Sequence, residues 1–192
     1  PEELINKLPN LKLVITSGMW NASVDEKALK KRNIIFCGTD TKIHSTAELA
    51  WALIMNSWRG LQTEIQNMKD GKWQTTIGRG LKGNTLGIFG LGKQGKQVAR
   101  FGNAFGMNVI AWSHNLTKEI CELEKVTFVS SDEMFKISDV LSIHVQGGER
   151  YKDCIKLAEF DKMKKTAYLI NTSRGPIVNE DDLIIALSTN QI

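Results

Sequence analysis

Three glycines, Gly90, Gly92 and Gly95, have the spacing that points most directly to chemistry. They form a GxGxxG run between the apolar segment Thr85–Phe89 and an amphipathic stretch, which is the strand–turn–helix context that dinucleotide binding requires. In such a turn the first glycine permits the bend, the second lets the backbone approach a pyrophosphate, and the third lets the helix pack closely on the strand. The spacing predicts a dinucleotide site, and the alternative is a glycine turn that serves packing alone.

The helix after this turn would begin near Lys93. Its first N–H groups have no partner within the helix and form the positive end of the helix dipole. An anion placed there gains about 0.3–1 kcal/mol. We therefore expect Lys93 and Gln94 to donate backbone N–H groups to the phosphates of a bound cofactor.

The next strand candidate, Asn108–Trp112, leads into Ser113. NAD-binding proteins of this architecture usually place an acidic residue here to bind the ribose hydroxyls. The missing carboxylate removes the repulsion of a 2′-phosphate, yet no arginine between residues 112 and 117 offers to bind one. Lys118 could do so if the loop folds back, and Ser113 could instead bind the ribose of NAD. The sequence leaves the choice between NAD and NADP open, and we expect weak discrimination.

A further apolar strand candidate, Ala167–Asn171, leads into Thr172, Ser173 and Arg174. Ligands of open α/β sheets bind outside the carboxyl ends of the strands. A guanidinium suits a carboxylate because it can donate two parallel hydrogen bonds. Arg174 is therefore a candidate for binding a substrate carboxylate, and the alternative is an arginine that caps the following turn. His144 ends another strand candidate and would face the same crevice.

The elements that position these residues alternate along the chain. The strand candidates are short runs rich in β-branched residues, at Leu11–Thr16, Asn33–Phe36, Thr85–Phe89, Asn108–Trp112, Val126–Val129, Asp139–His144 and Ala167–Asn171. The stretches with helical periodicity are Val24–Lys31, Thr46–Met68, Lys93–Phe105, Ser131–Ile137 and Asp181–Leu187. This alternation predicts an α/β fold with a Rossmann-type doubly wound parallel sheet, covered by helices on both faces.

One stretch departs from this alternation. Thr46–Met68 is predicted as a single long helix, and the irregular segment Asp70–Gly83 follows it. A long helix followed by an irregular segment is typical of a connection between domains. We therefore predict a first domain over residues 1–75, which includes this helix, and a nucleotide-binding domain over residues 76–192.

The composition argues against several other classes of protein. The net charge of +4 is mild, and the basic residues are scattered rather than gathered into the stripe that nucleic-acid binding needs. The longest apolar run, Leu49–Met55, is far shorter than the roughly 20 residues of a membrane span. Cys37, Cys121 and Cys154 are odd in number and widely spaced, which is typical of reduced thiols in the cytoplasm. We expect neither nucleic acid nor membrane as a partner.

Four phrases resemble the D-isomer-specific 2-hydroxyacid dehydrogenase family and occur in the family's order. They are TAELAWAL from Thr46, LKGNTLGI from Leu81, SDVLSIH from Ser138 and MKKTAYLINTSRGPIV from Met163. The resemblance implies an NAD(P)-dependent enzyme that transfers a hydride between the cofactor and a small 2-oxo or D-2-hydroxy acid. It also implies a homodimer.

The resemblance assigns roles to single residues. Arg174 matches the catalytic arginine that holds the substrate carboxylate and the reacting oxygen. Thr172 and Ser173 would line the nicotinamide side of the cofactor, together with the backbone around Arg174. His144 matches a neighbour of the cofactor rather than the acid/base residue. Thr46 matches a position near the nicotinamide, although it could equally be the N-terminal cap of its helix.

The first part of the chain resembles the family's flavodoxin-like substrate domain, in which a loop offers N–H groups to the substrate carboxylate. Gly18 and Met19 are the expected donors. The family's paired glutamate and histidine, which transfer the proton, have no match before Ile192. We therefore expect a fragment, with residues 1–75 a remnant of the substrate domain, that binds dinucleotide without turnover. The alternative is a dinucleotide-sensing binding protein or corepressor on the same scaffold.

Overall fold

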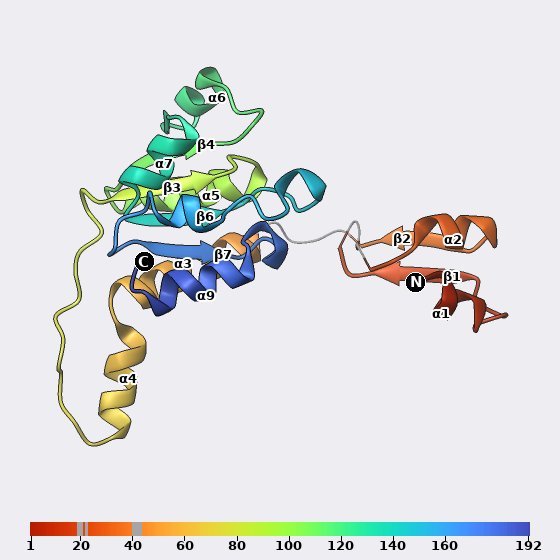
Figure 1. Cartoon of the computed structure of the whole chain (residues 1–192), viewed down its shortest axis with the longest axis horizontal. Helices are drawn as coiled ribbons and strands as arrows, with labels where there is room; N and C mark the ends of the chain where they lie inside the picture. Colours follow the sequence, from red (N-terminus) through yellow and green to blue (C-terminus); the bar gives the residue numbers. More distant parts are fainter. Residues whose placement is uncertain (19–20, 22, 40–43) are drawn as a thin grey trace. The chain divides into compact units, whose positions relative to one another are not determined.

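The computed structural model describes residues 1–18, 21, 23–39 and 44–192. The chain forms two compact units, Pro1–Lys42 and Ile43–Ile192 (Figure 1). The first unit contains α1 (Glu2–Asn6), β1 (Leu13–Thr16), α2 (Glu26–Lys31) and β2 (Ile35–Gly38). Its two strands pair in parallel, as two strands joined by a helix should. Its small core is formed by Ile5, Ala28, Leu29 and Ile34.

The second unit is built on a sheet of five parallel strands in the order β5-β4-β3-β6-β7. The chain winds outward from β3 through β4 to β5, and then returns to the other side of β3 for β6 and β7. The predicted doubly wound α/β fold is confirmed. The strands are β3 (Thr85–Phe89), β4 (Asn108–Trp112), β5 (Thr127–Phe128), β6 (Val140–Ile143) and β7 (Tyr168–Asn171).

Helices cover both faces of this sheet, and alternate strand residues divide into two cores. One core joins the sheet to α3 (His44–Trp58), α5 (Lys93–Ala104) and α6 (Lys118–Leu123). The other joins it to α7 (Ser131–Ile137), α8 (Leu157–Phe160) and α9 (Glu180–Ser188). Two 3-10 helices, η1 (Glu149–Tyr151) and η2 (Gly175–Ile177), follow β6 and β7.

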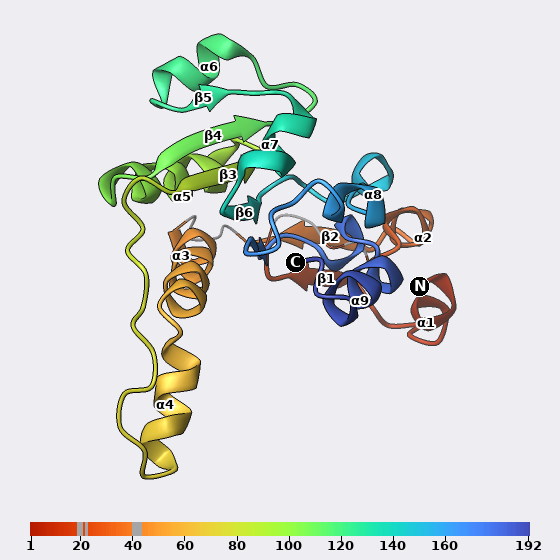
Figure 2. The ribbon, with the colours of Figure 1, turned by 60° about the vertical axis from the view of Figure 1, so that its left-hand side comes forward.

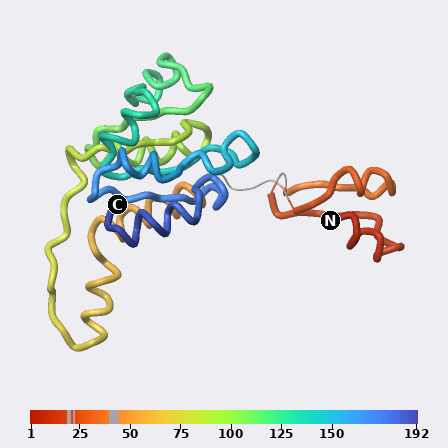
Figure 3. Tube along the Cα trace, viewed as in Figure 1, coloured from red at the N-terminus to blue at the C-terminus, as the bar shows by residue number. Residues whose placement is uncertain are grey.

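The single helix predicted over Thr46–Met68 is wrong, because the structure divides it into α3 and α4 (Leu61–Lys69). Gly60 separates the two helices in the left-handed region, with φ of +63°. The segment after α4 runs back beside it toward β3 (Figures 2 and 3). Glu64 holds this return, since its carboxylate accepts hydrogen bonds from the backbone N–H groups and hydroxyls of Thr75 and Thr76.

The chain divides into its two compact units between residues 42 and 43, whereas the sequence predicts a domain boundary between residues 75 and 76. The second unit begins at Ile43, since α3 packs on α5 and β7 of the nucleotide-binding sheet. Ala47, Ala50 and Ile54 of this helix are fully or almost fully buried in the same core as β3. The assignment of residues 1–75 to a substrate-binding domain stays a prediction.

Asp139, which directly precedes β6, joins three neighbouring strands. Its carboxylate accepts hydrogen bonds of 2.8 Å from the Thr85 N–H and from the Lys164 ammonium. Its own N–H donates to the Thr85 carbonyl, and its carbonyl accepts from the Tyr168 N–H. These bonds fix the register of β3, β6 and β7 at their amino ends, so the opposite ends of the strands also come together.

Candidate active site

Four sequence-predicted positions meet at the carboxyl edge of the five-stranded sheet. Gly90 follows β3, Ser113 follows β4, His144 follows β6 and Thr172 follows β7. Backbone bonds extend the ladder past the strand ends, since the His144 N–H donates to Phe89 and the Gly90 N–H donates to Trp112. The winding reverses between β3 and β6, and a crevice for ligands is expected at such a switch point.

Two of the three motif glycines are required by the packing of the protein itself. Gly90 has φ of +102°, and a Cβ there would lie 2.7 Å from Val145 Cγ1 and 2.8 Å from Val145 N. A Cβ on Gly95 would lie only 2.0 Å from the carbonyl oxygen of Gly90. The first glycine therefore makes the turn against β6, and the third brings α5 onto the end of β3, as predicted.

Gly92 differs from both. It is the N-cap of α5 with φ of −82°, which other residues adopt readily, and a Cβ there would meet nothing within 4 Å. The protein alone gives no reason for a glycine at this position. A pyrophosphate in the open space would give one, because it approaches the backbone closely. No side chain caps α5 and no acidic residue lies in its first turn, so the N–H groups of Lys93 and Gln94 suit an anion.

Two buried polar atoms lack partners at this edge. They are Gln94 Oε1 and Thr172 Oγ1, the two such side-chain atoms found among the described residues. A buried polar atom without a hydrogen bond costs about 1–3 kcal/mol, so each calls for an explanation. Gln94 lies in the first turn of α5, and Thr172 lies at the end of β7. Thr172 Oγ1 can donate to or accept from a cofactor at the nicotinamide side that the resemblance implies, and Gln94 Oε1 can accept from a cofactor hydroxyl. The residues present therefore fit a dinucleotide.

The loop after β7 is tied to the loop after β6. Ser173 Oγ donates to the Val145 carbonyl. The Asn171 side chain fixes the backbone of this loop through two hydrogen bonds. Its Oδ1 accepts from the Ser173 N–H at 3.0 Å, and its Nδ2 donates to the Arg174 carbonyl at 3.0 Å. The serine is thus held beside the end of β6, and its contact with the nicotinamide, which the resemblance implies, stays a prediction.

Arg174 is exposed at this edge, with Nη1 donating to the Ser173 carbonyl at 2.9 Å. It occupies the N-cap position of η2, but its side chain makes no cap hydrogen bond to that helix. The aliphatic part of the side chain lies against Gly147, where a Cβ would be 2.7 Å from Arg174 Cγ. Among the described residues the guanidinium donates to the Ser173 carbonyl and forms no salt bridge, so its remaining donors are available to a carboxylate.

His144 is largely buried, and its Nε2 is 2.8 Å from the hydroxyl oxygen of Ser142. Burial lowers its pKa from 6.5 to about 4, because the cationic form loses its hydration. The imidazole is therefore neutral near pH 7 and has no proton to give as an imidazolium. This agrees with the expectation that it is a neighbour of the cofactor and not the acid/base, although that role stays a prediction.

The loop after β6 also reaches the loop after β4, which the sequence did not indicate. Arg150 Nη1 lies 3.5 Å from Asn115 Oδ1. The rings of Tyr151 and His114 are 5.6 Å apart, and Tyr151 also packs edge-on against Phe89 at 5.9 Å. Sequence reasoning did not find this arginine, because it lies 35 residues from Asn115 in the chain and no local pattern relates the two. A side chain that binds a cofactor phosphate could also come from the loop after β6, because β4 and β6 lie on either side of β3.

Three predicted residues lie elsewhere. Thr46 is half-buried in the first turn of α3, which begins two residues earlier at His44, so Thr46 is not the N-terminal cap of its helix. Gly18, in the first unit, has φ of +103°, and its N–H donates to Thr39 Oγ1 at 3.1 Å. Met19 lies outside the described residues. The contacts of Thr46, Gly18 and Met19 with cofactor or substrate stay predictions.

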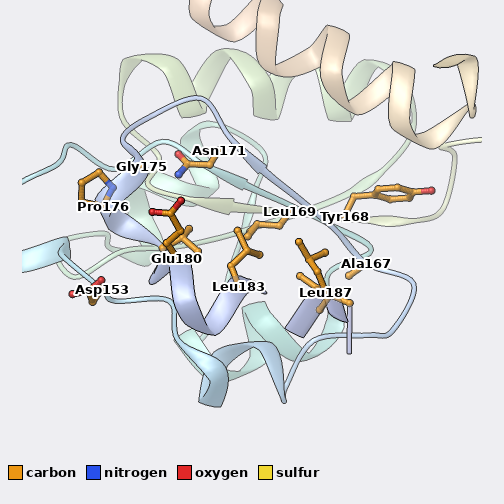
Figure 4. A pocket seen from close by; sticks show the side chains of 12 residues that line it. Asp153, Ala167, Tyr168, Leu169, Asn171, Gly175, Pro176, Glu180, Leu183 and Leu187 are labelled. Carbon is orange, nitrogen blue, oxygen red and sulfur yellow. The ribbon is translucent and has the colours of Figure 1, made fainter. Parts of the chain in front are cut away.

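A cavity of about 870 Å³ lies between β7 and α9 and not over the glycine turn (Figure 4). Leu169, Leu183 and Leu187 line it, and neither Gly92 nor Arg174 does. It is therefore a mainly apolar space beside an edge strand, and among the polar side chains described above Asn171 lines it. The described residues contain no cluster of metal-ligating side chains and no helix long and apolar enough to cross a membrane.

Residues 51–192 match the sequence model described as "D-isomer specific 2-hydroxyacid dehydrogenase, NAD binding domain". The chain is also 33% identical over 195 residues to 4-methyl-2-oxopentanoate reductase A of Aspergillus oryzae, an alignment that covers 99% of the chain and 59% of that relative.

Solved structures give the same picture. The phosphoglycerate oxidoreductase of Vibrio cholerae superimposes with a TM-score of 0.94 at 30% identity, covering 99% of the chain and 62% of that structure. The D-lactate dehydrogenase of Aquifex aeolicus, solved with NAD and lactic acid, gives a TM-score of 0.86 at 31% identity, covering 100% of the chain and 59% of that structure. The chain thus spans 59% to 62% of the length of these three relatives.

The first prediction separates the two kinds of glycine. Gly92→Val should leave the fold intact, because its side chain enters open space, but should lower NADH and NADPH affinity at least about tenfold by blocking the phosphates. Gly95→Val should instead destabilise the fold by about 3 kcal/mol or more, because its Cβ meets a backbone carbonyl. Calorimetric titration and urea unfolding measure the two effects. Unchanged cofactor affinity in the Gly92 variant would contradict this division.

The second prediction concerns acid stability. Between pH 6.5 and about pH 4, the unfolded chain binds a proton at His144 that the folded protein does not bind. Stability should therefore fall as the pH falls through this window, by on the order of 3 kcal/mol. Urea unfolding of His144→Gln should show a smaller loss between pH 6.5 and pH 5, with His114→Gln as the exposed control. Equal pH dependence in wild type and His144→Gln would refute the assignment.

Proposed function

The chain belongs to the D-isomer specific 2-hydroxyacid dehydrogenase family, and from this premise we propose that its protein reduces small 2-oxo acids to D-2-hydroxy acids with NAD(P)H, and catalyses the reverse oxidation. The observation that carries the proposal is the meeting of two unlike features at one sheet edge. A glycine turn opens into free space at Gly92, and an exposed guanidinium, Arg174, follows β7. The first suits a dinucleotide and the second suits a substrate carboxylate.

The chain's own residues have distinct tasks in this scheme. The backbone from Gly92 to Gln94 would bind the pyrophosphate, and Thr172 Oγ1 would hydrogen-bond to the nicotinamide half. When bound, NAD(P)H supplies the hydride that reduces the C2 carbonyl. Arg174 would bind the substrate carboxylate and stabilise the negative charge that develops on the C2 oxygen. Ser173 would hold the strand end in place through its bond to Val145.

The proton for the C2 oxygen needs a separate donor. An arginine cannot give up a proton near neutral pH, and burial keeps His144 neutral and bonded to Ser142. Since a positioned acid/base contributes typically about 10²–10⁴-fold, we propose that the 192 residues alone bind dinucleotide with negligible turnover. The same observation favours the second candidate, a dinucleotide-sensing binding protein or corepressor. Turnover of 2-oxo acids by the protein at its natural length decides between them.

The third prediction tests Arg174. In the protein at its natural length, Arg174→Gln should raise KM and lower kcat together, with kcat/KM falling about a hundredfold or more. The reason is that the guanidinium both binds the substrate carboxylate and stabilises the transition state. The kcat/KM of Arg174→Lys should lie between those of the wild type and Arg174→Gln, because lysine keeps the charge but loses the bidentate geometry. NADH oxidation with glyoxylate, hydroxypyruvate and related 2-oxo acids measures both constants. Full activity in Arg174→Gln would exclude the residue from the mechanism.

A homodimer is proposed from the arm formed by α4 and residues 70–80. No residue of α4 is buried, and the arm exposes several large apolar side chains, including Trp73 at 79% and Ile77 at 91% of their full surface. Such a patch marks a protein–protein contact in a water-soluble fold. A cytoplasmic location is proposed from the free thiols of Cys37, Cys121 and Cys154, which suit a reducing compartment.

The fourth prediction tests this arm. Replacing Trp73 and Ile77 together with serine should shift the protein from dimer to monomer, because the apolar contact area is lost while the monomer fold is unaffected. Analytical ultracentrifugation at micromolar concentration measures the change. Leu123→Ser is the matched control, since Leu123 is 83% exposed but lies on α6, away from the arm. A wild-type monomer, or a dimer that survives the double change, would contradict the proposal.

A further inference from the structure

We propose that Arg150, which follows β6, binds the 2′-phosphate of NADP at the end of β4 and makes the protein prefer NADPH to NADH. This inference rests on the dinucleotide binding proposed above. It names the cofactor that the site takes, which the sequence left open.

The end of β4 is where a sheet of this winding meets the adenine ribose. Ser113 occupies the position of the usual acidic residue and is half-buried, and its carbonyl accepts the turn-forming bond from the Leu116 N–H at 3.1 Å. A serine here can hydrogen-bond to a ribose or a phosphate, but does not repel a phosphate. The position is therefore permissive for NADP and lacks only a cation.

Arg150 supplies that cation from across the central strand. Its Nη1 lies 3.5 Å from Asn115 Oδ1, two residues beyond Ser113. Tyr151 anchors this part of η1, because its ring packs edge-on against Phe89 and also lies against His114. The Arg150 guanidinium lies 6.0 Å from the centre of the same ring. Contacts from both loops thus place the guanidinium beside the end of β4.

The positive charge of Arg150 is the property that suits a phosphate. Within the described part of the chain it forms no salt bridge, and its hydrogen bond to Asn115 is long and made to a neutral amide. By contrast, Arg100 on α5 binds the carboxylate of Glu124 at 2.9 Å. A guanidinium that is positioned but unpaired suits a phosphate dianion, which can accept two of its donors.

The chemistry distinguishes the two cofactors. NADP carries a 2′-phosphate where NAD carries a hydroxyl, so an ionic contact with Arg150 can strengthen the binding of NADPH alone. If the guanidinium instead stacked on the adenine ring, it would strengthen both cofactors equally, because the adenine is common to them. The ratio of the two affinities therefore reports on the phosphate contact.

The experiment is calorimetric titration of the chain with NADPH and NADH, and with adenosine 2′,5′-bisphosphate and 5′-AMP as small probes. In Arg150→Gln the affinities for NADPH and for the bisphosphate should fall about tenfold to a hundredfold, while those for NADH and 5′-AMP should change less than about twofold. Arg100→Gln is the matched control and should leave the ratio unchanged. The wild-type preference for NADPH should shrink as salt is raised.

A second variant, Ser113→Asp, tests the same subsite from the other loop. Its carboxylate should weaken NADPH binding by repulsion and leave NADH binding equal or tighter. An unchanged NADPH affinity in this variant would mean that the phosphate does not lie at the end of β4, and would overturn the inference.

Three further outcomes would overturn it. In the first, the wild-type protein binds NADH as tightly as NADPH. In the second, Arg150→Gln lowers the affinity for both cofactors equally, and in the third it lowers the affinity for neither. In each of these cases dinucleotide binding itself is observed, so the proposed function stands. Wild-type protein that binds neither cofactor would remove the proposed function and the inference together.

Discussion

The approach of α5 to the end of β3 is the constraint on which the site depends. A Cβ on Gly95 would lie 2.0 Å from the Gly90 carbonyl, so the helix and the strand touch through bare backbone. Only this closeness brings the first turn of α5 to the sheet edge where β4, β6 and β7 also end. Gly90 completes the junction, since its left-handed turn fits directly against Val145 of the neighbouring strand end. The open space at Gly92 is what remains between these contacts.

The loop contacts extend that constraint across the switch point. Ser173 bonds to the Val145 carbonyl, and Arg174 packs its aliphatic part on Gly147. In the other direction, Arg150 reaches Asn115. The loop after β6 therefore touches the loop after β7 on one side and the loop after β4 on the other. A substitution in this single loop would therefore alter the contacts of both the nicotinamide half and the adenosine half of the proposed cofactor site.

Local patterns were sufficient for the central elements of the fold. The predicted bounds of β3, β4 and α7 agree with the structure, because each is a continuous run of one periodicity with clear turn residues around it. The strand ends, and with them the positions of Gly90, Ser113, His144 and Thr172, followed from the parallel order of the sheet. The phrases that resemble the family then implied roles for Arg174 and its neighbours, and those roles stay predictions.

Features that no local pattern marks were not predictable in this way. The apolar pattern runs unbroken through Gly60, and the break between α3 and α4 appears only in the backbone angle at this residue. The two compact units divide between residues 42 and 43, because α3 has the periodicity of a connecting helix yet is buried on the sheet. The domain boundary expected between residues 75 and 76 stays a prediction. Arg150 and Asn115 are 35 residues apart in the chain, and no local pattern relates them.

The unpartnered oxygens of Gln94 and Thr172 bear on how this protein could be engineered. Each lowers the stability of the ligand-free fold, so random mutagenesis selected for heat resistance without cofactor should favour apolar replacements at these two positions. Those replacements would fill the core at the expense of the groups that receive a ligand. A selection for robustness carried out with saturating dinucleotide would reverse that pressure and retain both side chains.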